Sequence, residues 1–267
     1  MRRVVVAALV ALTLACAGAR KAQRPTPEQL PEVPSGLSTL QLLSEAHAAF
    51  AQRPDPEAVR RAEAFFEAAA QQDPQNVEAL YGAIEAKLWR VDRAADASER
   101  DALAGSAVES GRQCVARAPD AAACHYGLAL ALGIEGRERH SVALSNLQQM
   151  IAELRRAEEL DPRFEQAGPA RVLGVVSVRA PGWPVGPGDA ETGLEEARKA
   201  VDLFAEYPPN LLALSEALLA NGAAEESRQW AERALGLAQA QQQQGDPDAP
   251  SWVTEAEQLI AGKRSGT

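Results

Sequence analysis

A proline that returns at almost constant spacing constrains the fold of this chain more than any other feature. It stands at positions 74, 119, 162 and 208, so the intervals are 45, 43 and 46 residues. Proline has no backbone N–H donor and its ring clashes with a continuing helix, so each occurrence marks where one helix stops and the next begins. Self-similarity at this length is typical of stacked helical hairpins, which present binding surfaces.

The residues before the first of these prolines sharpen the prediction. Ala62, Phe66 and Ala69 lie 12, 8 and 5 residues before Pro74. This pattern of small and aromatic residues is typical of the second helix of a tetratricopeptide repeat, although the spacing exceeds the 34 residues of that repeat. We therefore predict an all-α fold of stacked antiparallel hairpins over residues 37–263, with elongated repeats of about 45 residues. A coincidental helical bundle is the alternative.

Helical periodicity runs through this whole region, with apolar residues at steps of three and four. Residues 172–178 are rich enough in β-branched side chains to form a strand, but a solitary strand would have no partner, so we predict helix there too. Ser38, Asp55 and Asp189 are expected to cap helix N-termini. The predicted helices are 38–52, 56–72, 76–92, 98–117, 120–135, 141–160, 164–179, 190–206, 209–221, 223–243 and 251–262.

Residues 1–15 have the three-part form of a secretory signal peptide. Arg2 and Arg3 form a short positive region, an apolar run follows at residues 4–14, and small residues come next. An apolar run of this length cannot span a bilayer, which needs about 20 residues. We therefore predict export and not a membrane helix.

Cys16 stands where the apolar run stops, directly after Ala15, as in a bacterial lipobox. We predict lipidation of Cys16 and a Pro-rich tether over residues 16–36 that holds the domain off the membrane. Ordinary cleavage after Ala19, which would leave a soluble protein, is the alternative. Ala17 replaces the Asp that would argue for inner-membrane retention. By similarity to well-studied lipoproteins, the predicted location is the periplasmic face of the bacterial envelope, anchored in the outer membrane.

No pattern of residues indicates catalysis, a metal or a cofactor. His47, His125 and His140 lie in separate predicted helices without the spacing of metal ligands. No nucleophile motif such as GxSxG is present. The net charge of −10 makes the chain a poor binder of nucleic acid. The sequence therefore predicts a protein that is not an enzyme.

Cys114 and Cys124 flank the turn that contains Pro119. Export would place them in an oxidising compartment, and antiparallel helices could bring them face to face. Cysteine is also a good small core residue. A disulfide and a pair of buried thiols are both compatible with the sequence.

The segment 180–189 differs most in composition from the helical pattern around it, since six of its ten residues are Pro or Gly. It is too rigid for a flexible linker and too irregular for a helix. Trp183 is held on this frame. We interpret its indole first as a plug that packs the groove between hairpins, and second as a wall of a ligand site.

This segment and its surroundings resemble the TatT-type lipoproteins associated with tripartite ATP-independent periplasmic (TRAP) transporters. The similarity extends over about residues 75–235 and is most specific at 157–190, in the runs 160–164, 168–174 and 180–184. It implies a tetratricopeptide-like, exported and lipidated protein. It also implies a periplasmic solute-binding protein as partner, and homo-oligomers, since some members form trimers around a channel.

The resemblance implies Arg171 and Trp183 as groove residues. Gly127 departs from the pattern, because an aromatic residue would be expected after Tyr126, and this affects any pocket on that helix. A solute-handling protein is expected to have an enclosed cavity lined by Trp183, Tyr126 and Trp89. The alternative function, a general scaffold for outer-membrane or secretion-machine assembly, is expected to have an open concave surface that binds peptides.

Overall fold

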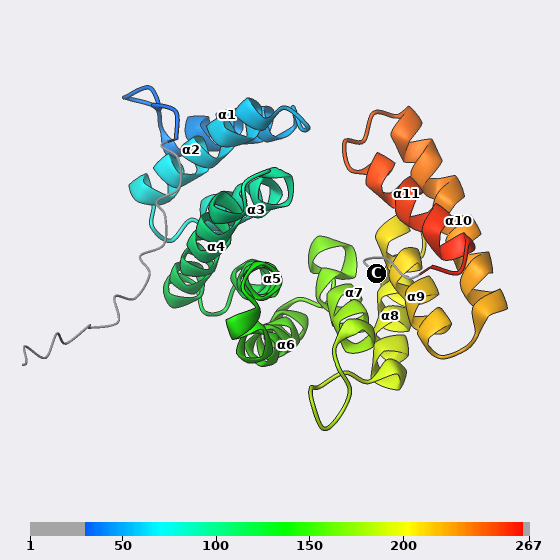
Figure 1. Cartoon of the computed structure of the whole chain (residues 1–267). Helices are drawn as coiled ribbons and strands as arrows, with labels where there is room; N and C mark the ends of the chain where they lie inside the picture. The colour runs from blue at the N-terminus through cyan, green and yellow to red at the C-terminus, as the bar shows by residue number, and fades with distance from the viewer. Residues whose placement is uncertain (1–29, 264–267) are drawn as a thin grey trace, which may run out of the picture.

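The structure is a computed structural model that describes residues 30–263, and it is entirely helical apart from loops and a single isolated bridge in that range (Figure 1). The signal peptide 1–15, Cys16 and most of the predicted tether lie outside the described residues. None of the described helices is long and apolar enough to cross a membrane. The elements are α1 (Thr39–Phe50), α2 (Pro56–Gln72), α3 (Val77–Arg93), α4 (Ala97–Arg117), α5 (Ala122–Glu138), a short 3-10 helix (His140–Val142), α6 (Ala143–Leu160), α7 (Phe164–Arg179), α8 (Ala190–Leu203), α9 (Pro208–Ala220), α10 (Ala224–Gln243) and α11 (Ala249–Ile260).

Consecutive helices pair as hairpins, α1 with α2, α3 with α4, α5 with α6, α7 with α8 and α9 with α10, and α11 packs on the last of them. The recurring prolines lie at the junctions between hairpins, and Pro208 is the first residue of α9. The predicted all-α hairpin architecture is therefore confirmed. The hairpins stack into a curved array whose opposite ends, at α1 and α11, face each other across an opening (Figure 1).

The helices begin where the predicted caps stand. Ser38 accepts a hydrogen bond from the backbone N–H of Gln41 and completes a capping box. Asp55 and Asp189 accept from the first turns of α2 and α8. The β-branched run 172–178 lies within α7, so it is helical, as predicted. Val33, within the predicted tether, already packs against the core, so packing begins before Ser38.

The small and aromatic residues that indicated a tetratricopeptide repeat are all buried. Phe66 is 1% exposed, and Ala62 and Ala69 are fully buried beside it. A Cβ on Gly82 of α3 would come within 2.5 Å of the Phe66 ring. Glycine at this position therefore lets α3 approach α2 closely enough for the ring to fill the space between them.

The start of α7 differs from the predicted helix. Glu165, Gln166 and Ala167 have φ values of 49°, 50° and 63°, so they form a left-handed turn. The right-handed helix follows, with Pro169 in its first turn, where a missing N–H costs nothing. Three consecutive left-handed non-glycine residues are unfavourable in isolation. Hydrogen bonds from α7 and α9 to the carbonyl groups of this turn compensate for its cost.

Candidate functional site

A cleft of about 1390 Å³ lies on the inner side of the curved array and is open to solvent along one side. Its walls come from α1, α3, α5, α7, α9 and α11, with a contribution from α6. These are the first helices of each hairpin and the last helix of the chain. The cleft exceeds the roughly 300–1,000 Å³ of ordinary small-molecule pockets.

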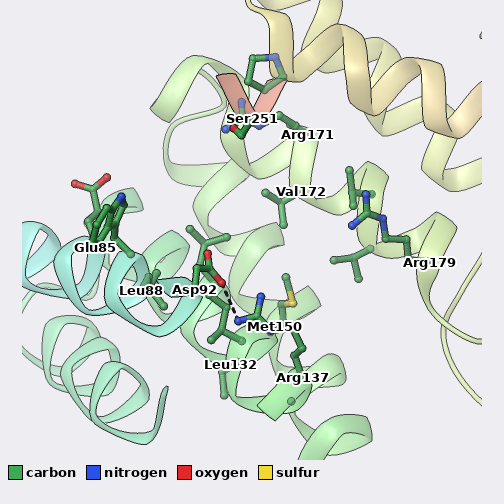
Figure 2. A pocket seen from close by; sticks show the side chains of 18 of the residues that line it. Glu85, Leu88, Asp92, Leu132, Arg137, Met150, Arg171, Val172, Arg179 and Ser251 are labelled. Carbon is green, nitrogen blue, oxygen red and sulfur yellow. Dashed lines mark ion pairs between the residues drawn. The ribbon is translucent and has the colours of Figure 1, made fainter. Parts of the chain in front are cut away.

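The middle of the cleft is apolar. Leu88 of α3, Leu132 of α5, Met150 of α6 and Val172 of α7 contribute to its lining, and Figure 2 shows their side chains around the same space. These side chains come from three hairpins, so the surface exists only in the stacked array. An apolar floor flanked by polar groups is suited to an amphipathic partner.

One end of the cleft is fixed by ion pairs between neighbouring elements. Arg137 of α5 contacts Asp92 of α3 with 2.8 Å between Nη2 and Oδ1, as the dashed line in Figure 2 marks. Arg179 of α7 makes two bonds to Glu216 of α9, at 2.8 and 2.6 Å. Two parallel N–H···O bonds between a guanidinium and a carboxylate are strong and directional. These pairs therefore hold adjacent hairpins in register at the cleft.

Arg171 lines the other end and is held by its own neighbourhood. Its Nη1 donates to the carbonyl oxygens of Glu165 and Gln166, at 3.1 and 3.2 Å, and to Oδ1 of Asn210 at 3.0 Å. Nη2 donates to the hydroxyl of Tyr126 at 3.4 Å. Arg171 forms no ion pair with any carboxylate of the described residues. Its guanidinium therefore stabilises the left-handed turn and leaves a positive charge at the cleft.

Asn210 completes this arrangement. It is fully buried, and its amide nitrogen donates to the carbonyl oxygens of Gln166, Ala200 and Phe204, at 3.0, 3.0 and 3.2 Å. One side chain thus satisfies acceptors at the start of α7 and the end of α8. Asn210 also orients Arg171, because its amide oxygen accepts from that guanidinium.

Glu85 is a titratable group of the cleft whose pKa is strongly shifted. Burial, reinforced by the negative charge of Glu165, raises its pKa from 4.5 to about 7. Arg53 and a hydrogen bond from the Tyr81 hydroxyl act in the opposite direction. Burial also raises the pKa of Tyr81 well above its usual value. Near neutral pH this part of the cleft therefore contains a carboxyl group that is partly protonated.

The structure separates the four residues that the sequence assigned to the groove. Arg171 and Trp89 line the cleft. Trp89 is 8% exposed, and the guanidinium of Arg93 stacks over its indole at 3.9 Å. Tyr126 is buried behind the wall, where its ring meets Phe164 edge-on, so it supports Arg171 and does not face the cleft.

Trp183 requires a correction. Its side chain is 90% exposed on the loop between α7 and α8, so it neither plugs a groove nor lines the cleft. The loop closes on itself through a bond from the Gly188 N–H to the Pro181 carbonyl, at 2.8 Å. A side chain at Gly188 would collide with the Ala180 carbonyl. The backbone thus sets the shape of this loop, and the indole projects from it.

The remaining candidate residues have structural partners. Cys114 and Cys124 form a disulfide between α4 and α5, with 5.1 Å between their Cα atoms. His125 lies between Glu153 and the Pro119 carbonyl, at 2.6 and 2.8 Å, and His47 contacts Glu78 at 2.6 Å. His140 begins the 3-10 helix. Within residues 30–263 no group of acidic, His or Cys side chains is arranged to hold a metal ion.

Sequence reasoning missed Glu85, Arg53 and Asp248, which all line the cleft. Arg53 and Asp248 are 195 positions apart and meet through an ion pair of 3.0 Å. No local motif contains them. Their proximity results from the curvature of the whole array, and this curvature cannot be predicted from the sequence of a single repeat.

The fold is similar to that of a tetratricopeptide-repeat protein of known structure. This is TTC0263, a thermophilic TPR protein of Thermus thermophilus, whose crystal structure aligns with a TM-score of 0.61 and 22% identity over 82% of this chain and 99% of that chain. The crystal structure of the MamA protein aligns with a TM-score of 0.46 and 18% identity, over 77% and 94% of the two chains. The chain matches no protein-family model and no curated protein. The likeness to the Thermus protein shows a tetratricopeptide-like fold.

Proposed function

We propose that this chain is an envelope lipoprotein that binds a partner protein as an accessory component of a TRAP-type solute uptake system. Its partner would be the periplasmic solute-binding protein, and its anchor a lipid on Cys16. The resemblance of residues 157–190 motivates the choice of system. The observation that carries the binding role is the wide cleft, open along one side, with its apolar floor and charged ends.

The form of the cleft favours a macromolecular partner over a small enclosed solute. Trp183 and Tyr126, which were expected to close a solute cavity, do not line it. A partner helix or loop could lay apolar side chains against the half-buried Leu147, Val172 and Val175 and reach the charged groups of the cleft. The same openness supports the second candidate function, a general scaffold for outer-membrane or secretion-machine assembly.

A direct binding measurement tests the proposal. Val172→Glu would place a charge on the apolar floor and should weaken, at least tenfold, binding of a purified TRAP-type solute-binding protein from the same organism. Leu144→Glu is the matched control, because Leu144 is half exposed on α6. Calorimetric titration of both variants decides the matter. Absence of binding by the wild-type protein would reject the TRAP role, and binding that Val172→Glu leaves unchanged would reject the cleft as the site.

The anchor is tested separately. Cys16→Ser should release the protein from the membrane fraction and block acyl labelling. Release of the wild-type protein, with an N-terminus at Arg20, would instead support ordinary signal cleavage after Ala19.

A further inference from the structure

The two ends of the helical array touch at the mouth of the cleft. Arg53 lies in the loop after α1 and Asp248 immediately before α11, and their Nη2 and Oδ2 atoms are 3.0 Å apart. Among the helices of residues 30–263, none from α1 to α4 packs against α9, α10 or α11. The ion pair is therefore a polar link between parts of the array that share no helix packing.

The side chain of Arg53 and the backbone of Asp248 are each held by neighbouring residues. The guanidinium of Arg53 stacks on the Phe50 ring at 4.1 Å, and its Nη1 donates to the Phe50 carbonyl at 3.0 Å. The Arg53 side chain is 16% exposed. On the other side, the Asp248 N–H donates to the Asp246 carboxylate at 2.8 Å. Because the Arg53 side chain is already held, this ion pair loses less side-chain entropy than one between two free surface side chains, although the Asp248 side chain is 40% exposed.

The carboxyl group of Glu85 also lies close enough to interact with the Arg53–Asp248 ion pair. Arg53 also acts electrostatically on Glu85, which in turn senses Glu165 and Asp248. Two carboxyl groups, those of Asp248 and Glu85, thus interact with the Arg53 guanidinium at the place where the ends meet. If Asp248 moves away, Arg53 retains its stacking on Phe50, and its guanidinium loses its ion-pair partner at the cleft.

We propose that the Arg53–Asp248 ion pair is a clasp that holds the two ends of the array together at the mouth of the cleft, and that its release widens the entrance for an acidic segment of the partner protein. Phe50, Arg53 and Asp248 all belong to the cleft lining, so widening the gap between them widens the entrance. A carboxylate of the incoming segment takes the place of Asp248 on Arg53. This inference rests on the cleft being the binding site of the proposed function.

The clasp is tested by a distance measurement that needs no partner. Nitroxide labels on cysteines introduced at the exposed positions Ala51 and Thr254, in the full chain with Cys16→Ser, report the separation of the two ends. Arg53→Gln and Asp248→Asn should each shift the distance distribution to longer values, and the exchange Arg53→Asp with Asp248→Arg should restore it. Arg156→Gln, which removes an exposed ion pair to Asp120, is the matched control and should change nothing.

Access to the cleft needs its own readout. Nile red, a neutral apolar dye, should associate several-fold faster with Arg53→Gln than with the wild-type protein, and Val172→Glu should abolish its binding. Distributions that stay unchanged in both neutralising variants would overturn the clasp. Longer distances with an unchanged dye rate would overturn its role as a gate. Neither result depends on the identity of the partner, so failure of the TRAP role and failure of the clasp are distinguishable.

Discussion

The two halves of the molecule use the same hairpins but are stabilised differently. One continuous apolar core runs from Leu42 in α1 to Leu173 in α7 and includes Phe66 and Leu132. In the second half the buried apolar residues are divided among smaller clusters between α7 and α11. Polar side chains connect these clusters, as in the buried pair Ser215 and Ser227, whose hydroxyl groups lie 3.0 Å apart.

The interactions that stabilise a helical repeat array can therefore differ from one part of the chain to another. The first half gathers most of its buried apolar residues in the one continuous core, where contacts are many and individually small, and it also contains a buried ion-paired group of Glu63, Lys87 and Arg90. The second half has only smaller apolar clusters, so directional bonds carry a larger share of its stability; such bonds contribute modestly when satisfied and cost more when one partner is lost. We therefore expect the second half to open first in native-state hydrogen exchange.

The largest expected effect comes from the first half. Phe66→Ala removes a fully buried ring and leaves the space against Gly82 empty, so the free energy of unfolding should fall by about 3–5 kcal/mol. Leu214→Ala in the second half should cost about 2–3 kcal/mol, because the smaller cluster around it can collapse more easily. Urea unfolding of both variants measures the difference, and a larger loss for Leu214→Ala would contradict the comparison.

The next largest effect is expected in the second half of the molecule. Asn210→Ala leaves the carbonyl groups of Gln166, Ala200 and Phe204 without their shared donor and frees Arg171, so we expect a loss of about 3 kcal/mol. Circular dichroism during urea unfolding measures it. Asn221→Ala is the matched control and should cost less than about 1 kcal/mol, since that side chain is exposed. Equal losses would mean that burial of the amide is unimportant.

The disulfide adds a constraint to the first half alone. Cys114 and Cys124 are separated by 10 positions, so the closed loop is short and its loss should cost at most about 3 kcal/mol by the chain-entropy estimate. The double variant Cys114→Ser with Cys124→Ser is compared with the wild-type protein in urea, with and without reductant. Two alkylatable thiols in freshly purified protein would show that the bond is absent.

Much of the fold was accessible from the sequence because its signals are local. Recurring prolines, the caps Ser38, Asp55 and Asp189, and apolar periodicity predicted every helix to within three residues at either end. The left-handed turn at 165–167 was not predictable, since its residues favour a right-handed helix. Asn210, 43 positions beyond Ala167, supplies the bonds that stabilise the turn.

The site was less accessible for the same reason. Arg171, which the resemblance included, lines the cleft, whereas Arg53 and Asp248 meet only through the curvature of the array. Trp183 was misplaced because a rigid Pro- and Gly-rich frame was expected to dock against the body of the protein. The frame is instead closed by its own backbone bonds, which sequence composition does not reveal.

A smaller effect concerns the interface between the halves. Burial is the main reason that the pKa of Glu85 in α3 is raised, and the carboxylates of Glu165 and Asp248, which belong to the second half, raise it further. Between pH 4.5 and about 7 the folded state binds this proton more tightly than the unfolded state, so stability should decrease as pH rises through that window. Because Glu85 is partly exposed, we expect about 1–2 kcal/mol. Urea unfolding at pH 5 and pH 8 should show this loss in the wild-type protein and not in Glu85→Gln; the same loss in both would exclude Glu85 as the cause.

The smallest effect is expected at the loop that belongs to neither core. Trp183→Ala should change the free energy of unfolding by no more than about 0.5 kcal/mol, since its indole is 90% exposed and leaves no cavity when removed. A plug between hairpins would cost about 3–5 kcal/mol on the same truncation, so thermal unfolding separates the two cases. Gly188→Ala provides the contrast, because the added methyl group meets the Ala180 carbonyl and must distort the loop. A stable Trp183→Ala beside a destabilised Gly188→Ala would show that the backbone frame, and not the indole, maintains the shape of this loop.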